Sequence, residues 1–318
     1  MNESNERSSK EPVTVTLYWN HICILHNFEK AYLANLQERL RSEGIHLVVR
    51  FFGLGYDEHM AAYLARDGAQ MPDLIVSADL EVFECAKVFD ALGPLHDCAT
   101  WLPLKSTAVV QAVKRTDQLL PVVAIPLVLY GGSPIPNDPL PTLVRNARVA
   151  FGGIDNSAGK ILVKSVWERY GKAVAEELLQ RCTVTAMPIR AFKAARTKEA
   201  DFALVPSLYA LRADGTDSFF EASHEGPVLL PSYFCARTSV EESVARRVCR
   251  ELLSEELLDF YAANGDLVAC PQQPLEHAST QDDADACLTV SQSFIDALDS
   301  RTFYELYRQH IPSAEVIG

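Results

Sequence analysis

Strand-like and helix-like stretches alternate along the first part of this chain, and this alternation restricts its fold more than any other feature. Residues 13–19 alternate between outward and inward positions with the period of a β-strand, and apolar side chains within 20–41 recur with the period of a helix. The same pair follows at 46–52 and 57–65, and a short apolar strand at 74–76 precedes a further helix. This order predicts an α/β fold with a mostly parallel sheet.

The rest of the chain contains a second unit of the same kind. Long apolar strands are predicted at 122–130 and 227–236, and shorter ones between them at 148–152 and 201–206. The two long strands lie where the chain would leave the first unit and later return to it. Two such crossings form a hinge, and a hinge over a crevice is a common way for a protein to close on a ligand.

We therefore expect two lobes, each a mostly parallel sheet flanked by helices, joined by a two-strand hinge. Helices are predicted to complete the chain, the last at 292–311. The predicted division is a first lobe of residues 13–123 plus 232–318, a second lobe of 124–231, and a flexible polar N-terminus at 1–12.

The charge balance of the chain excludes some classes of partner. It holds 29 Lys and Arg against 42 Asp and Glu, a formal net charge of −13. Binding to nucleic acid depends on basic patches that displace counterions from phosphates, and attraction to an anionic membrane surface also needs basic residues. No apolar run approaches the roughly 20 residues that a membrane-spanning helix needs. We therefore expect no nucleic-acid partner and no membrane span.

The N-terminus and the cysteines indicate in which cellular compartment the protein works. Residues 1–12 are polar and mixed in charge, and no long apolar run with a small-residue cleavage site follows them, so they do not have the pattern of a signal peptide. We favour the cytoplasm, or an extracytoplasmic location if the true start lies upstream. The eight cysteines contain no CxxC pair, and we expect most of them to be reduced and buried. They are Cys23, Cys85, Cys98, Cys182, Cys235, Cys249, Cys270 and Cys287.

Four segments, taken in order, resemble those of one protein family. They are PDLIVSADLE at 72–81, FGGIDNSAG at 151–159, FALVPS at 202–207, and LLSEE at 252–256 followed by Asn264-Gly265. The set is similar to the corresponding segments of type II periplasmic-binding-protein-like proteins, which serve ABC transporters. The resemblance runs from about Val13 to Cys270.

The resemblance implies the two-lobed fold, a small-molecule or ion ligand in the cleft between the lobes, and an ABC permease as a partner. It is nearest in character to the members that bind iron and small anions. The adjacent tyrosine pair typical of ferric-ion binders is absent, and only Tyr233-Phe234 stands near its place. The export signal that is usual in the family is also absent.

In the first lobe, candidate ligand contacts follow two predicted strands. Asn20 and His21 come directly after the first strand, with Trp19 as a wall for stacking, while Ser77 and Asp79 follow the third strand. Ser77 would offer a hydroxyl and nearby N–H groups to an anion, and Asp79 would favour a cation or an amine. The alternatives are a core tryptophan, a surface histidine, and simple helix capping by the polar residues.

The second lobe offers a similar arrangement. Asn156 and Ser157 lie among small residues just before a predicted helix, where a ligand can approach exposed N–H groups. Tyr233, on the returning strand, would close over the cleft, or it would pack in the core instead.

A cysteine and a histidine form the one local pattern that suggests a metal. Cys23 and His26 are three apart on a predicted helix and so share a face, with His21 in the preceding turn. Thiolate and imidazole suit Zn²⁺, copper or iron. The spacing matches no standard zinc motif, and buried cysteine with capping histidine is the alternative. We expect no resident cofactor other than this metal ion, which stays an open alternative.

Three functions remain open on the sequence alone. The first is a non-enzymatic solute-binding protein linked to ABC-type transport or to sensing. The second is a cytoplasmic biosynthetic enzyme on the same fold, of the menaquinone, thiamine or tetrapyrrole type, although no GxSxG, HExxH, P-loop or GxGxxG motif is present. The third is a metal-binding sensor. We predict the first.

Overall fold

The computed structural model describes residues 12–53, 56, 58–153, 157–272 and 287–310. Its strands join in the order β2-β1-β3-β9-β4-β7-β5-β6, and β8 and β10 also pair with β4. The strands are β1 Val13–Asn20, β2 Ile45–Phe52, β3 Leu74–Ser77, β4 Leu120–Gly131, β5 Val149–Gly152, β6 Thr183–Thr185, β7 Phe202–Pro206, β8 Phe219–Glu221, β9 Val228–Ala236 and β10 Val268–Ala269.

Each half of this sheet contains three parallel strands. β1 is parallel to β2 and β3, and β5 is parallel to β6 and β7. β9 and β4 run antiparallel to their neighbours between these two groups. The predicted α/β class, with two mostly parallel sheets joined through two strands, is therefore confirmed.

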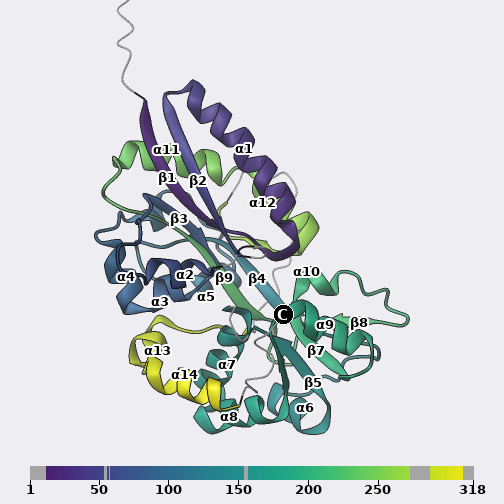
Figure 1. The fold of residues 1–318 in the computed structure, drawn as a ribbon. Helices are drawn as coiled ribbons and strands as arrows, with labels where there is room; N and C mark the ends of the chain where they lie inside the picture. The colour runs from purple at the N-terminus through teal and green to yellow at the C-terminus, as the bar shows by residue number, and fades with distance from the viewer. Residues whose placement is uncertain (1–11, 54–55, 57, 154–156, 273–286, 311–318) are drawn as a thin grey trace, which may run out of the picture.

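β4 is the physical connection between the two halves. Its first residues, from Leu120 to Leu127, pair with β9, and the residues from Leu127 to Gly131 pair with β7. All twelve of its residues are buried, which explains why the sequence at this place is almost wholly apolar. Figure 1 shows β4 and β9 passing from the upper lobe, which holds β1 to β3, to the lower lobe, which holds β5 and β7.

Helices cover both halves of the sheet (Figure 1). Those of the first lobe are the 3-10 turns Cys23–Leu25 and Cys98–Thr100 and the helices α1 His26–Ser42, α2 Met60–Leu64, α3 Glu81–Glu84, α4 Ala86–Leu92, α5 Ala108–Val113, α11 Glu242–Leu252 and α12 Glu255–Gly265. The others are α6 Leu140–Asn146, α7 Ser157–Tyr170, α8 Lys172–Arg181, α9 Pro188–Arg196, α10 Ser207–Ala210, α13 Gln292–Ala297 and α14 Ser300–Gln309. No helix among the described residues is long and apolar enough to cross a membrane.

The C-terminal helix that the sequence predicts as one piece consists of two. α13 ends at Ala297, and α14 begins at Ser300 because the Asp299 carboxylate caps it, accepting the N–H groups of Arg301 and Thr302. Both helices lie beside α7 in Figure 1, although the predicted division placed residues 232–318 in the first lobe. The exact division into lobes stays a prediction.

Candidate ligand-binding site

The carboxyl ends of three parallel strands meet at one edge of the first lobe. Trp19 of β1 lies opposite both Phe51 of β2 and Val76 of β3. Asn20 and Ser77, the next residues of their strands, therefore reach that edge side by side. Ligands of open α/β sheets bind outside the carboxyl ends of the strands. The structure thus brings together the two first-lobe loops that the sequence singled out.

A hydrogen bond joins this edge to the other lobe. The hydroxyl of Ser157, the first residue of α7, accepts the backbone N–H of Leu80 at 2.9 Å. The Ser77 hydroxyl, in the same turn of the first lobe, accepts the N–H of Asp79 at 2.9 Å. Both serines are buried. Ser77 and Ser157, which the sequence predicts as ligand contacts from the two lobes, therefore lie at the same short turn. Asn156, predicted beside Ser157, lies outside the described residues.

The Asp79 carboxylate hydrogen-bonds to the start of α2 rather than to α3, the helix that follows it in the chain. The carboxylate accepts the N–H of Ala61, in the first turn of α2, at 3.0 Å. Burial raises the pKa of the Asp79 carboxyl, and the Ala61 N–H opposes that shift by stabilising the charged form. The N-cap of α3 is Leu80 and no side chain caps that helix, so the alternative in which Ser77 or Asp79 caps the helix that follows is wrong.

Two ion pairs connect α3 with α7 just beyond this turn. Lys160 Nζ lies 2.8 Å from Glu81 Oε1, and Lys164 Nζ lies 2.6 Å from Glu84 Oε2. The second pair is buried, with each side chain 7% exposed. Breaking a buried pair leaves an uncompensated charge, which costs about 3–5 kcal/mol. Separation of the lobes at this point therefore requires other groups, from water or a ligand, to solvate these four charges.

Arg115 gives this cluster an excess of positive charge. Its Nη2 lies 3.3 Å from Glu84 Oε1, and its side chain is 5% exposed. Glu84 therefore serves two buried cations, Arg115 and Lys164, and the three groups carry a formal charge of +1. An anionic group brought to this place would compensate that charge.

His21 is held by a buried carboxylate. Its Nδ1 lies 2.5 Å from Glu29 Oε2, and Glu29 also accepts the Tyr261 hydroxyl at 2.6 Å and the Ile22 N–H at 3.2 Å. An ionised carboxylate only accepts hydrogen bonds, so this network assigns the proton to Nδ1 and a lone pair to Nε2 in the neutral ring. Nε2 is buried and has no hydrogen-bond partner among the described residues. The ring stacks on Phe51.

Trp19 and Tyr233 are core residues in this structure. Each is 1% exposed. The Tyr233 hydroxyl donates to the Val113 carbonyl at 2.7 Å, and burial raises the pKa of that hydroxyl. The indole Nε1 of Trp19 has no hydrogen-bond partner among the described residues. The alternative of core packing therefore describes both positions, while Asn20 stays half-buried at the strand edge.

The predicted metal pair is described only in part. His26 begins α1, and its ring lies edge-on to that of His21 with 6.1 Å between centroids. The side chain of Cys23 lies outside the described part of the structure. In that described part, no group of three or more His, Cys, Asp and Glu residues is placed to hold a metal ion. The metal site stays a prediction.

Sequence reasoning missed the charged residues that line the contact between the lobes. Lys160 and Lys164 are four apart in the mostly apolar first part of a helix, and Glu81 and Glu84 are three apart. Such spacing places each pair on one helix face, and two lysines within a buried stretch are unusual enough to be a signal. The sequence does not indicate that the two faces meet.

Three solved structures illustrate what the chain is similar to. The iron-bound HitA of Pseudomonas aeruginosa is 17% identical, with a TM-score of 0.66 over 94% of this chain and 99% of that one. A periplasmic thiamin binding protein is 14% identical, with a TM-score of 0.67 over 96% and 98%. A substrate binding protein of an ABC transporter from Agrobacterium tumefaciens is 12% identical, with a TM-score of 0.64 over 94% of each chain.

At these identities the likeness concerns the fold. No family model matches the sequence, and no curated protein matches it. The solved structures nevertheless cover nearly the whole of this chain and of their own. The chain therefore has the two-lobed fold of the type II periplasmic solute-binding proteins, as the resemblance in its sequence predicted.

Proposed function

We propose that the protein captures a small polar solute between its lobes. The observation that carries this proposal is the contact between the Ser157 hydroxyl and the Leu80 N–H, at 2.9 Å. It places the beginning of α7 against the turn that follows β3, where Ser77 and Asp79 also lie. A solute that enters between the lobes would take over these polar groups.

Several physical features favour binding at this place. The first turn of the fourteen-residue helix α7 directs N–H groups and the positive end of its dipole toward the turn. The Arg115, Glu84 and Lys164 cluster adds a buried excess positive charge. Both favour a solute that carries a carboxylate or another oxyanion. Asp79 and Glu81, on the facing side, would accept hydrogen bonds from its donor groups.

The proposal includes the biological setting. The three similar structures are described as iron-bound, as thiamin binding, and as the substrate binding protein of an ABC transporter. By analogy of fold, we propose that this protein delivers its solute to an ABC permease. The alternative is that it works in the cytoplasm, where we propose that the captured solute is sensed rather than transported. The seven cysteines whose side chains are described are free thiols, which suits a reducing compartment.

The test is a ligand screen with a matched pair of variants. Thermal-shift assays, followed by calorimetry, would cover carboxylates, inorganic oxyanions, amino acids, amines and metal ions. We expect an anionic or zwitterionic solute to raise the melting temperature. Ser157→Ala should then weaken its binding by about tenfold, the value of one hydrogen bond to a charged group. Ser243→Ala, a surface control, should not.

Two results would contradict the proposal. One is a folded protein whose melting temperature no class of solute changes. The other is a solute that binds the Ser157→Ala variant with the wild-type affinity.

Catalysis is a second candidate, and one observation favours it. A histidine whose Nδ1 is oriented by a buried carboxylate, with Nε2 unpartnered among the described residues, is the arrangement of a general base. The same screen separates the two functions if the incubated solutes are examined by mass spectrometry. A solute recovered unchanged indicates binding. A solute that the wild type converts and the His21→Gln variant does not convert indicates catalysis.

A further inference from the structure

The C-terminal segment 287–309 contacts both lobes. It begins beside β9, where the Leu288 N–H donates to the Pro227 carbonyl at 3.0 Å and the Leu229 N–H donates to the Leu288 carbonyl at 2.9 Å. It then forms α13 and α14. Figure 1 shows the two helices beside α7, on the side of the molecule where α3 and α4 approach from the upper lobe.

Its main attachment is to α7 in the second lobe. Phe303 is 1% exposed, and its ring lies 6.5 Å from that of Trp167 and 4.9 Å from Lys164 Nζ. The Tyr307 hydroxyl donates to the Gly153 carbonyl at 2.9 Å. The Ser291 N–H donates to the Glu168 carboxylate at 2.9 Å. These contacts fix the segment to the second lobe independently of the first.

A second set of contacts reaches the first lobe. The Tyr304 hydroxyl donates to Glu81 Oε1, the same carboxylate oxygen that pairs with Lys160. Glu81 belongs to α3, one residue after the Leu80 N–H that bonds Ser157. Tyr304 therefore adds a hydrogen bond from the C-terminal segment to the ion pair that joins the lobes.

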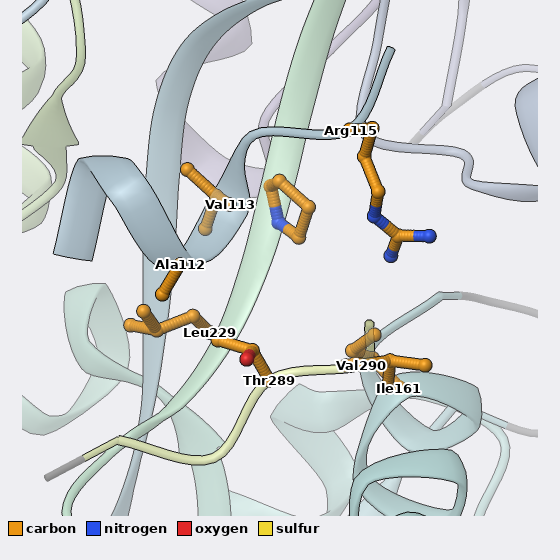
Figure 2. Close-up of a pocket in the computed structure, with 8 residues that line it drawn as sticks. Ala112, Val113, Arg115, Ile161, Leu229, Thr289 and Val290 are labelled. Atoms are coloured by element: carbon orange, nitrogen blue, oxygen red, sulfur yellow. The ribbon is translucent and has the colours of Figure 1, made fainter. Parts of the chain in front are cut away.

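The start of the segment also closes a small pocket between the lobes. Figure 2 shows Thr289 and Val290 facing Val113 and Arg115 of the first lobe, with Ile161 of α7 beside them. Apolar side chains from four parts of the chain, including Leu229 of β9, meet there next to the Arg115 guanidinium. If the lobes separated, these residues would come apart together with the Tyr304 and Glu81 pair.

We propose that segment 287–309 is an internal latch: it is fixed to the second lobe and holds the first lobe in the closed position through Tyr304. The latch shifts the balance between open and closed lobes toward closed, and it slows the separation that a solute needs to enter. This proposal rests on the two-lobed fold and on movement at the hinge, but not on any particular solute.

Two conservative variants separate a latch from a merely structural segment. Tyr304→Phe removes the hydroxyl that reaches the first lobe, and Tyr307→Phe removes one that stays within the second-lobe contacts. Both keep their aromatic rings. The measurements, made on the full chain without added ligand, are hydrogen exchange of the Leu80 amide and the radius of gyration from small-angle scattering.

We expect Tyr304→Phe to raise the exchange rate of the Leu80 amide about tenfold, as loss of a hydrogen bond to a carboxylate would imply, and to increase the radius of gyration. Tyr307→Phe should leave both at wild-type values, because Phe303 and Ser291 still attach the segment to α7. If Tyr304→Phe matches the wild type, or if Tyr307→Phe opens the molecule as much as Tyr304→Phe does, the latch is disproved. Because no solute is used, failure of this test is distinct from failure of the proposed binding function.

Discussion

At the scale of single residues, the site is built from buried charges that depend on one another. Glu29 holds His21, Glu84 holds Arg115 and Lys164, and Asp79 holds the first turn of α2. Each carboxylate has lost water and has gained protein donors in exchange. Burial of a carboxylate weakens its charged form, and hydrogen bonds strengthen it.

For the Asp79 carboxylate, the effect of burial is larger than that of its hydrogen bond. This predicts the direction in which a substitution changes the stability of the protein. The folded pKa of Asp79 is raised, so folding favours the protonated form, and ionisation at neutral pH lowers the free energy of unfolding. We expect Asp79→Asn, which keeps an oxygen for the Ala61 N–H, to raise the melting temperature at pH 7. The gain should shrink as the pH falls and the wild-type carboxyl becomes protonated. Thermal denaturation between pH 3 and pH 8 measures it.

Asp201→Asn is a control for which we expect the opposite change in stability at pH 7. The Arg148 guanidinium and backbone N–H hold the pKa of the Asp201 carboxyl below its usual range, so its charged form is stabilising at pH 7. The pair is exposed, and its loss should lower stability only slightly. An Asp79→Asn variant that is less stable than wild type at pH 7 would contradict the burial argument.

At the scale of elements, α7 is the helix around which the site is assembled. Its residues from Ser157 to Val166 are all buried, and they contact the turn after β3, helix α3 and the C-terminal segment. Gly159 permits this close packing. A Cβ at that position would lie 2.6 Å from the Tyr307 hydroxyl and 3.0 Å from the carbonyl oxygens of Gly152 and Gly153.

A methyl group at Gly159 should therefore disturb both α14 and the start of α7. We expect Gly159→Ala to lower the free energy of unfolding by about 1–3 kcal/mol, the usual cost of overpacking, despite the higher helix propensity of alanine. Denaturant unfolding measures it. Gly132→Ala is the control, because a Cβ there would meet only Asp217 O at 3.8 Å. Equal stability of the two variants would show that α7 has room that the structure does not indicate.

The sequence predicted elements better than it predicted their contacts. Alternation and apolar runs identified β1, β3, β4 and β9 closely, because a strand's period and burial are local properties of the chain. The turn after β3 and the start of α7 were both predicted as site segments, and they do meet, because Ser157 accepts the N–H of Leu80 in the turn that begins at Ser77. The partners of Lys160, Lys164 and His21 could not be predicted, since they come from distant segments and depend on how the lobes pack.

At the scale of the whole molecule, few backbone connections but many side-chain contacts join the two lobes. Only β4 and β9 among the described strands continue from one half-sheet to the other, so little of the backbone resists a change of angle. The closed position is held instead by side chains: the Ser157 hydroxyl, the ion pairs of α3 with α7, and Tyr304. A solute can shift the balance only by binding the closed and open forms differently.

The central claim is that the solute binds between the turn after β3 and the start of α7. The most direct test is a crystal structure of the full chain with the solute that gives the largest thermal shift in the screen. We predict that the solute lies between Leu80 and Ser157, replaces their direct hydrogen bond, and has its anionic group toward the α7 N-terminus. A solute bound elsewhere, with the Leu80 and Ser157 contact intact, would contradict the account.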